Sequence, residues 1–187
     1  MTERVAEIPW AVSNAVAPVL DVGCAESSYL ADLPAPVDGI DVRPCASPAL
    51  HDFYRGDIRE YPLPQRYATV LAVSTLEHVG LACDAYGTIA DDPDGDRRAL
   101  DGCVGATAPG GKVLVSVPFG NPGDHVWFRQ YDLARLDALL KGYDATIDIR
   151  VGPHWDIPAG VVDVDVDYDH RHGTAGAVAL VTVKKAP

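Results

Sequence analysis

The residues best placed to do chemistry stand in a strand-and-turn segment near the start of the chain. The apolar run Val16–Val22 ends at Gly23, which suits a buried strand followed by a tight turn. Asp41 stands twenty residues after Asp21 and closes a second apolar run, Val37–Val42. A carboxylate in that position can accept hydrogen bonds from both hydroxyls of a ribose. This spacing predicts a site for a cofactor that contains a nucleoside.

The composition of the turn favours S-adenosylmethionine (SAM) over a dinucleotide. A dinucleotide seats its diphosphate on a helix N-terminus, and glycines allow the close approach. Here Ala25 and Ser28 occupy the second and third glycine positions, and Glu26 stands where the diphosphate needs donors. SAM has no phosphate and carries an ammonium and a sulfonium, so an acidic turn suits it. Ser27 or Ser28 is expected to cap a helix after the turn. An NAD-linked oxidoreductase is therefore disfavoured.

Strand-sized apolar runs alternate with helical patterns along the rest of the chain. Asp96–Thr107 and Asp132–Lys141 have the helical period, and Asp132 is expected to cap the second helix. Nearly continuous apolar character in the strands indicates burial on both faces of a parallel sheet. The pattern predicts an α/β fold with a doubly wound, mainly parallel sheet of seven strands. The further runs are Asp52–Asp57, Ala68–Ser74, Lys112–Val117, Thr146–Val151 and Ala177–Val183.

The length, net charge and composition of the chain limit the kinds of molecule that it is expected to bind. The 187 residues fit one domain over 1–187, and the net charge of -12 comes without any basic cluster. Nucleic-acid binding needs a basic face that neutralises phosphates, so we expect no nucleic-acid partner. The apolar runs are too short to span a membrane, and the four cysteines lack zinc-site or disulfide-frame spacing. We expect a cytoplasmic protein that acts on a neutral or cationic small molecule, with a homodimer as one possible state.

Five segments in order give the chain its resemblance to a known family. They are Leu20-Asp21-Val22-Gly23-Cys24, Gly39-Ile40-Asp41, Gly56-Asp57-Ile58, Leu76-Glu77-His78-Val79 and Pro109-Gly110-Gly111. Together they resemble the class I SAM-dependent methyltransferases over about Val19 to Val183. The resemblance implies a Rossmann-like methyltransferase fold in which the C-terminal strand runs antiparallel.

The resemblance also implies which residues hold the cofactor. The first turn would bind the methionine end of SAM, through Asp21, Gly23, Cys24 and Ala25. Asp41 would bind the ribose and Val42 would lie against the adenine. Asp57 and Ile58 would meet the adenine amino group and ring face, and the methyl group would lie above Ser74, Thr75 and Leu76. The family usually has a glycine where Ala25 stands, and an added methyl there would narrow the approach of SAM.

Methyl transfer to a hydroxyl or an amine is helped by a general base, and two histidines are candidates. His78 follows the fourth strand by about one helical turn, and His125 lies in the loop after the fifth strand. Either histidine has a structural alternative, in which it only packs against its neighbours. Nearby aromatic side chains either wall the acceptor pocket or anchor this loop: Trp127, Phe128 and Tyr131.

Two other segments bear on the site. Val161–Asp169 alternates valine and aspartate, which predicts a half-exposed strand rather than a metal site, even with His170 and His172 following. We therefore predict no metal. Thr2–Val16 has room for only one short covering helix, and otherwise the site is open.

These observations favour methyl transfer from SAM to an O or N acceptor on a small molecule, such as a sugar or secondary metabolite. Two alternatives remain: methylation of a protein or glycan, and a non-catalytic domain that binds SAM without transfer.

Overall fold

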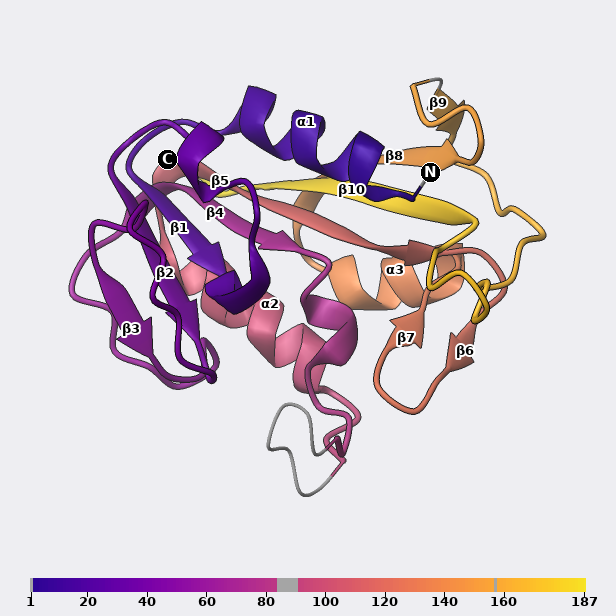
Figure 1. Cartoon of the computed structure of the whole chain (residues 1–187), viewed down its shortest axis with the longest axis horizontal. Coiled ribbons are helices and arrows are strands. Elements are labelled where there is room, and N and C mark those ends of the chain that lie inside the picture. The colour runs from indigo at the N-terminus through magenta and orange to yellow at the C-terminus, as the bar shows by residue number, and fades with distance from the viewer. Residues whose placement is uncertain (1, 84–90, 157) are drawn as a thin grey trace.

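An eight-stranded sheet organises the residues described by this computed structural model, which are 2–83, 91–156 and 158–187 (Figure 1). The strand order is β3-β2-β1-β4-β5-β10-β8-β9. The bounds are β1 Val19–Val22, β2 Val37–Asp41, β3 Phe53–Arg55, β4 Tyr67–Val73, β5 Thr107–Phe119, β8 Asp144–Val151, β9 Pro158–Gly160 and β10 Ala177–Lys184. The prediction of a single domain over 1–187 includes residues outside these ranges and stays a prediction.

The strand directions match the predicted doubly wound topology. Strands β1 to β5 pair in parallel, and β10 lies antiparallel between β5 and β8. The chain builds β2 and β3 on one side of β1, and then returns to place β4 on the other side. Ligands bind at such a reversal of strand order, outside the carboxyl ends of the strands.

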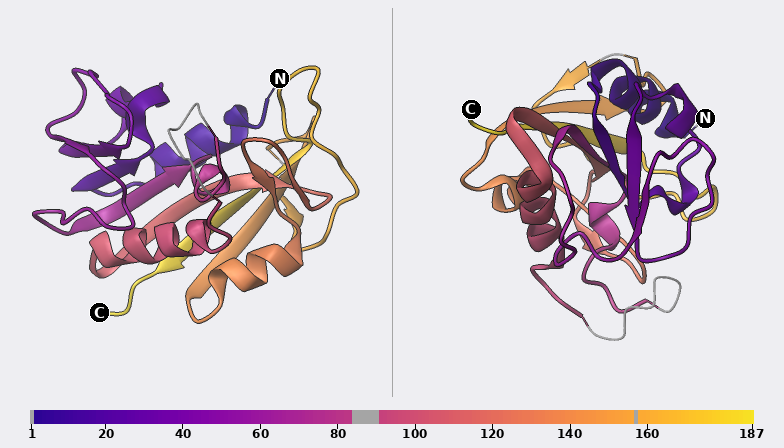
Figure 2. Two further views of the ribbon diagram at one scale, coloured as in Figure 1. Left: turned by 90° about the horizontal axis from the view of Figure 1, so that it is seen from below. Right: turned by 90° about the vertical axis from the view of Figure 1, so that its left-hand side faces the viewer.

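Helices cover both faces of the sheet. In Figure 1, α1 (Arg4–Asn14) lies above the sheet, and α2 (Gly95–Ala106) and α3 (Leu133–Leu140) lie below it. Figure 2 shows α2 and α3 in front of the strands when the molecule is seen from below. Alternate residues of β4 enter opposite cores, with Leu71 on the α1 side and Val70 on the α2 side. Burial on both faces explains the continuous apolar runs.

Two helix predictions are confirmed, one in the bounds of the helix and the other in its capping residue. The predicted helix Asp96–Thr107 is α2, within one residue at each end. The Asp132 side chain accepts a hydrogen bond from the Arg135 backbone N–H at 2.8 Å, which caps α3 as expected.

The predicted helix after β1 is wrong. Two short 3-10 turns replace it, η1 (Cys24–Glu26) and η2 (Leu30–Asp32), and the Ser27 hydroxyl donates to Asp21 instead of capping a helix. Only residues 23–36 separate β1 from β2, and they include Pro34 and Pro36. Proline lacks the backbone N–H that a helix interior needs, so the end of this link at Pro34 and Pro36 cannot continue as an α-helix.

The sheet has eight strands, not the seven predicted. The additional strand is β9, which pairs antiparallel with the outer edge of β8. Its sequence, Pro158-Ala159-Gly160, is atypical of strands, and proline is tolerated there because the strand lies at the edge.

The strand predicted over Val161–Asp169 is also wrong, although its alternation is confirmed. Val164, Val166 and Tyr168 are half-buried and the aspartates between them are exposed, yet 161–168 form no ladder. The edge of β8 is taken by β9, and segment 161–168 joins neither the main sheet nor the β6-β7 pair. Its contacts run instead to Asn121, whose backbone N–H donates to the Val166 carbonyl at 2.8 Å.

Smaller elements complete the described chain. They are η3 (Leu76–His78) after β4 and the two-stranded pair of β6 (Gly123–Asp124) and β7 (Arg129–Gln130). Among the described residues, none of the helices has both the length and the apolar character that a membrane span requires.

A buried aspartate joins β2 to its neighbours. Asp38 is 1% exposed and accepts hydrogen bonds from the Tyr67 hydroxyl and the Gln65 amide, both at 2.8 Å. The other carboxylate oxygen of Asp38 accepts a hydrogen bond from the Asp52 backbone N–H at 3.2 Å. Asp38 therefore holds β2, β3 and β4 together at the end opposite the switch point.

We expect Asp38→Ala to destabilise the fold by about 3 kcal/mol, because the buried Tyr67 hydroxyl loses a charged acceptor. Urea unfolding measures the change. Asp137→Ala, on the exposed face of α3, is the matched control and should change the free energy of unfolding by less than about 0.5 kcal/mol. Equal effects of the two variants would contradict the role assigned to Asp38.

Candidate functional site

A cavity of about 470 Å³ lies at the carboxyl ends of β1, β2, β3 and β4. The topology alone brings these strand ends together, although they are far apart in the sequence. Helix α1 contributes Arg4 and Ile8, so the predicted short covering helix is confirmed. Sequence-predicted cofactor residues that line the cavity are Gly23, Asp41, Val42, Asp57, Ile58, Ser74 and Thr75.

Gly23 makes the turn at the end of β1 with a left-handed backbone, φ +81°. A Cβ atom at this position would lie 2.6 Å from Thr75 Oγ1, which is too close for any other residue. Thr75 Oγ1 in turn donates to the Val22 carbonyl at 3.1 Å. The turn after β1 is therefore packed against the residues after β4, and glycine is required for two separate reasons.

Asp41 is held at the edge of the cavity by backbone groups. It is 6% exposed, and its Oδ2 accepts from the Ala25 N–H at 2.9 Å while its Oδ1 accepts from the Arg43 N–H at 2.8 Å. A carboxylate has about four acceptor positions, so Asp41 can still accept hydroxyl groups from a ligand. Ala25 does not line the cavity, so its methyl group does not narrow it.

Asp57 is engaged by an arginine that the sequence analysis did not single out. Arg59 binds both Asp57 oxygens and reaches Asp92 at 2.8 Å. Burial raises the pKa of Asp57, but hydrogen bonds and charge from Arg59 outweigh this and hold it below its ordinary value. Asp57 is therefore a paired carboxylate on the cavity wall.

The turn sequence suggested an acidic cavity, but the charges that line the cavity are balanced. Three carboxylates line it in the described chain, together with three guanidinium groups. Arg43 lies 2.7 Å from Glu26, so Glu26 is paired as well. The sequence contained a signal for this pairing, because Asp41-Val42-Arg43 and Asp57-Ile58-Arg59 repeat an Asp-x-Arg spacing. Arg4, the third cation, comes from α1, and no local pattern points to it.

Four of the predicted cofactor residues lie behind the wall and do not line the cavity. Asp21 is fully buried and accepts from the Ser27 hydroxyl at 2.6 Å and the Tyr29 hydroxyl at 2.8 Å. Burial raises the pKa of Asp21 to about 6, against these hydrogen bonds. Through these two hydrogen bonds, Asp21 holds the chain that follows Gly23 in place. The other three are Cys24, Ala25 and Leu76.

His78 is the candidate base that reaches the cavity. Its Nδ1 lies 2.7 Å from the Trp127 carbonyl, and its ring stacks on the Trp127 indole at 5.2 Å between centroids. Because a carbonyl only accepts, this hydrogen bond places the proton on Nδ1 and the lone pair on Nε2. Burial lowers the pKa of His78, partly offset by the hydrogen bond to Trp127. The ring is therefore neutral at pH 7.

His125 lies outside the cavity lining. Its ring stacks on Phe128 at 4.3 Å and meets His170 edge-on at 4.8 Å, as in the structural alternative. Of the three aromatic residues predicted to wall the acceptor pocket, Trp127 lines this cavity. Tyr131 does not, because it is 1% exposed and its hydroxyl donates to Asp96 at 2.7 Å.

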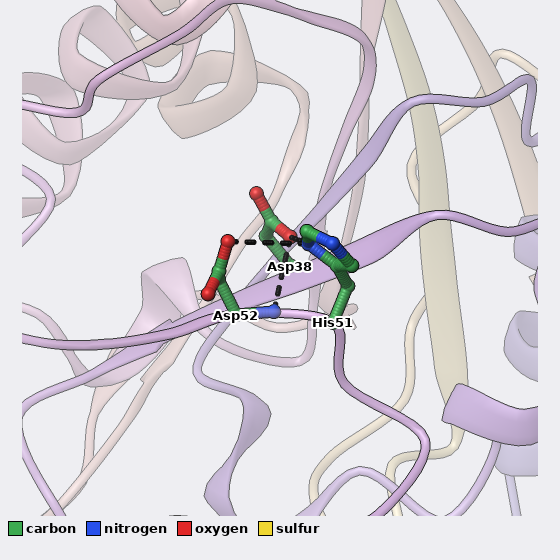
Figure 3. Close-up of side chains that lie close together, drawn as sticks. All are labelled: Asp38, His51 and Asp52. Atoms are coloured by element: carbon green, nitrogen blue, oxygen red, sulfur yellow. Dashed lines mark hydrogen bonds and ion pairs between the residues drawn. The ribbon is translucent and has the colours of Figure 1, made fainter.

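One grouping of potential metal ligands occurs in the described ranges, and it lies outside the cavity. His51 Nδ1 is 3.3 Å from Asp38 Oδ1 and 3.1 Å from Asp52 Oδ2 (Figure 3). Asp38 already accepts from Tyr67, Gln65 and backbone, so its oxygens serve the sheet. This grouping is explained as hydrogen bonding.

Comparisons with known proteins identify the fold. No family model matches the sequence, and no curated protein matches it either. The N-methyltransferase NodS from Bradyrhizobium japonicum WM9 is 16% identical with a TM-score of 0.61, covering 99% of this chain and 96% of NodS. The 1,6-didemethyltoxoflavin-N1-methyltransferase of Burkholderia thailandensis, solved with that compound and S-adenosylhomocysteine, is 15% identical with a TM-score of 0.64, covering 99% and 78%.

A third solved structure with this likeness, the [4+2]-cyclase SpnF, is 18% identical with a TM-score of 0.63, covering 99% of this chain and 81% of SpnF. At these identities the likeness shows the fold alone. The chain therefore has the Rossmann-like methyltransferase fold that its motifs predicted, with one strand more at the edge of the sheet.

We expect Asp21→Asn to change the pH dependence of stability. The folded chain holds the Asp21 proton more tightly than the unfolded chain, so its contribution is present below about pH 4 and is lost as pH rises through about 6. The variant does not titrate, so the stability of the wild type relative to Asp21→Asn should fall by about 3 kcal/mol across this range. Urea unfolding from pH 4 to 7 measures the difference, and a constant difference would contradict the burial argument.

Proposed function

We propose that this chain transfers a methyl group from SAM to an O or N acceptor on a small molecule. The observation that carries the proposal is the single cavity that collects Gly23, Asp41, Asp57 and Thr75 at the switch point of the sheet. The fold is one in which two of the solved structures named above are methyltransferases. The proposal adds an activity to that fold.

The residues present fit SAM better than a dinucleotide. The volume of about 470 Å³ lies within the range of small-molecule sites. A diphosphate needs the open N–H groups of a helix N-terminus, but residues 23–36 form no α-helix and the Ala25 N–H already donates to Asp41. Asp41 retains acceptor positions for a ribose. SAM is supported more directly by the lack of an α-helix over residues 23–36 than by the charge of Glu26, which is paired with Arg43.

The chain's own groups have three tasks in this reaction. Bound SAM supplies a methyl group activated by its sulfonium. Helix α1 covers the cavity through Ile8, which helps to exclude water. His78 presents Nε2 to accept a proton from the acceptor, and its lowered pKa keeps it in the basic form at pH 7. A base at His125 stays a prediction, although its ring packs away from the cavity.

Two alternatives keep a place beside this proposal. One is a domain that binds SAM without transfer. Arg59 engages both Asp57 oxygens at the position expected to meet the adenine amino group, which bears on the affinity for SAM and not on whether transfer follows. Methylation of a protein or glycan is the other. Isothermal titration with SAM, followed by turnover on small-molecule acceptors, separates these from the proposal, because SAM binding without any turnover favours the first alternative. A homodimer and a cytoplasmic location stay predictions.

Asp41→Asn should weaken SAM binding by about tenfold or more, because the amide offers fewer acceptors and no charge to the ribose hydroxyls. Isothermal titration measures the dissociation constant. Asp137→Asn makes the same change of charge on the exposed face of α3 and should leave the constant unchanged. Equal affinity of wild type and Asp41→Asn would remove Asp41 from the binding site.

His78→Gln should lower kcat by about a hundredfold while SAM affinity stays within about twofold, because only proton transfer is lost. Release of S-adenosylhomocysteine from a panel of phenols and amines measures turnover. His125→Ala serves as the comparison and should retain most activity. A large loss in His125→Ala with none in His78→Gln would move the base to His125.

A further inference from the structure

A second cavity of about 200 Å³ adjoins the first. The two share Arg4, Ser74, His78 and Trp127, so a ligand in one lies next to a ligand in the other. Its remaining lining residues come from the N-terminal residues before α1, from η3, from the end of β5, from the segment between β6 and β7, and from the loop that precedes β10. The sequence indicated Trp127 and Phe128 as candidate walls of an acceptor pocket, but it assigned no role to Glu77 and left the charge of the acceptor open.

Aromatic rings form one wall of this second cavity. Trp127, Phe128 and Tyr168 all line it. The Trp127 and Phe128 rings are 4.8 Å apart, and the Phe128 and Tyr168 rings are 4.5 Å apart, so the three form a continuous surface. Aromatic faces carry negative potential and attract a cation that comes within about 6 Å.

A buried carboxyl group, that of Glu77, lines the same cavity, and its Oε1 lies 3.8 Å from His78 Nε2. Glu77 is 2% exposed, and its Oε2 has no hydrogen-bond partner within the described chain. Buried polar atoms are nearly always paired, so an unpaired acceptor on a residue that lines a cavity points to a donor that arrives with a ligand. Burial raises the pKa of Glu77 well above its ordinary value, and a bound cation would favour the ionised form.

The other charged groups at this cavity are already engaged. Glu3 accepts from the Thr174 hydroxyl at 2.8 Å and from the Ala175 N–H at 3.2 Å. The Arg4 guanidinium lies 3.5 Å from Glu7 Oε2. The Glu77 oxygen is therefore the acceptor that remains to be satisfied.

We propose that the second cavity binds the amino group of the acceptor as an ammonium, with the Trp127, Phe128 and Tyr168 rings around it and Glu77 as its carboxylate partner. The role of this amine as methyl acceptor rests on the proposed function, and in that role the ammonium first gives a proton to His78, which frees the nitrogen lone pair for attack. The volume equals that of roughly seven water molecules at about 30 Å³ each. The substrate class is thus a primary or secondary amine whose nitrogen is attached to a small alkyl or arylmethyl group.

Benzylamine and benzyl alcohol test this proposal, because they match in shape and differ in charge at neutral pH. Dissociation constants for the full chain, measured by ligand-observed NMR, should favour benzylamine by about tenfold. Glu77→Gln keeps the size of the side chain and removes the charge, so it should cancel that preference while benzyl alcohol binds as before. Glu60→Gln, an exposed position outside both cavities, should keep the preference.

A second variant tests the proposal even if Glu77→Gln does not fold. Trp127 is 40% exposed, so Trp127→Leu should fold, and it should reduce the preference for benzylamine by several-fold. Equal binding of the two compounds by the wild type, or a preference for benzyl alcohol, would overturn the proposal.

Titration of the same samples with SAM separates the two proposals. SAM binding without any preference for benzylamine removes the amine site and leaves methyl transfer standing. A preference that depends on Glu77 in a chain that does not bind SAM keeps the amine site and removes methyl transfer.

Discussion

The structure depends on the parallel alignment of β1, β2 and β4, because parallel strands end at one edge of the sheet. That edge carries Gly23, Asp41 and Thr75 into contact range, although more than fifty residues separate the first from the last. The hydrogen bond from the Ala25 N–H to Asp41 locks the first turn to the second strand. Loss of this alignment would leave the same residues without a common cavity.

Charge in the site is organised as pairs. Arg43 and Arg59 stand two positions after Asp41 and Asp57, and each contacts the aspartate before it. A paired carboxylate costs less to bury than an isolated one and still offers acceptor positions. The first cavity therefore offers a ligand local carboxylate oxygens and not an excess of negative charge.

Helix α1 contributes to the lining of both cavities. Buried Glu7 accepts from the hydroxyls of Ser74 and Ser116 at the ends of β4 and β5, at 2.8 and 2.7 Å. Arg4, one turn earlier, lines both cavities. Burial raises the pKa of Glu7 although Arg4 and the two serines oppose it. Helix α1 is thus fastened by hydrogen bonds to the strand ends that carry the site, and it lines both cavities through Arg4.

Local pattern in the sequence was sufficient for the positions of the main strands, the turn at Gly23 and the carboxylate at Asp41, because apolar periodicity and glycine conformation are properties of short segments. It was not sufficient where the outcome depends on distant partners. Ser27 donates to Asp21 instead of capping a helix, Val161–Asp169 contacts Asn121 instead of forming a strand, and Glu77 Oε2 is left without a hydrogen-bond partner. Such contacts depend on which elements pack together, and only the tertiary structure decides that.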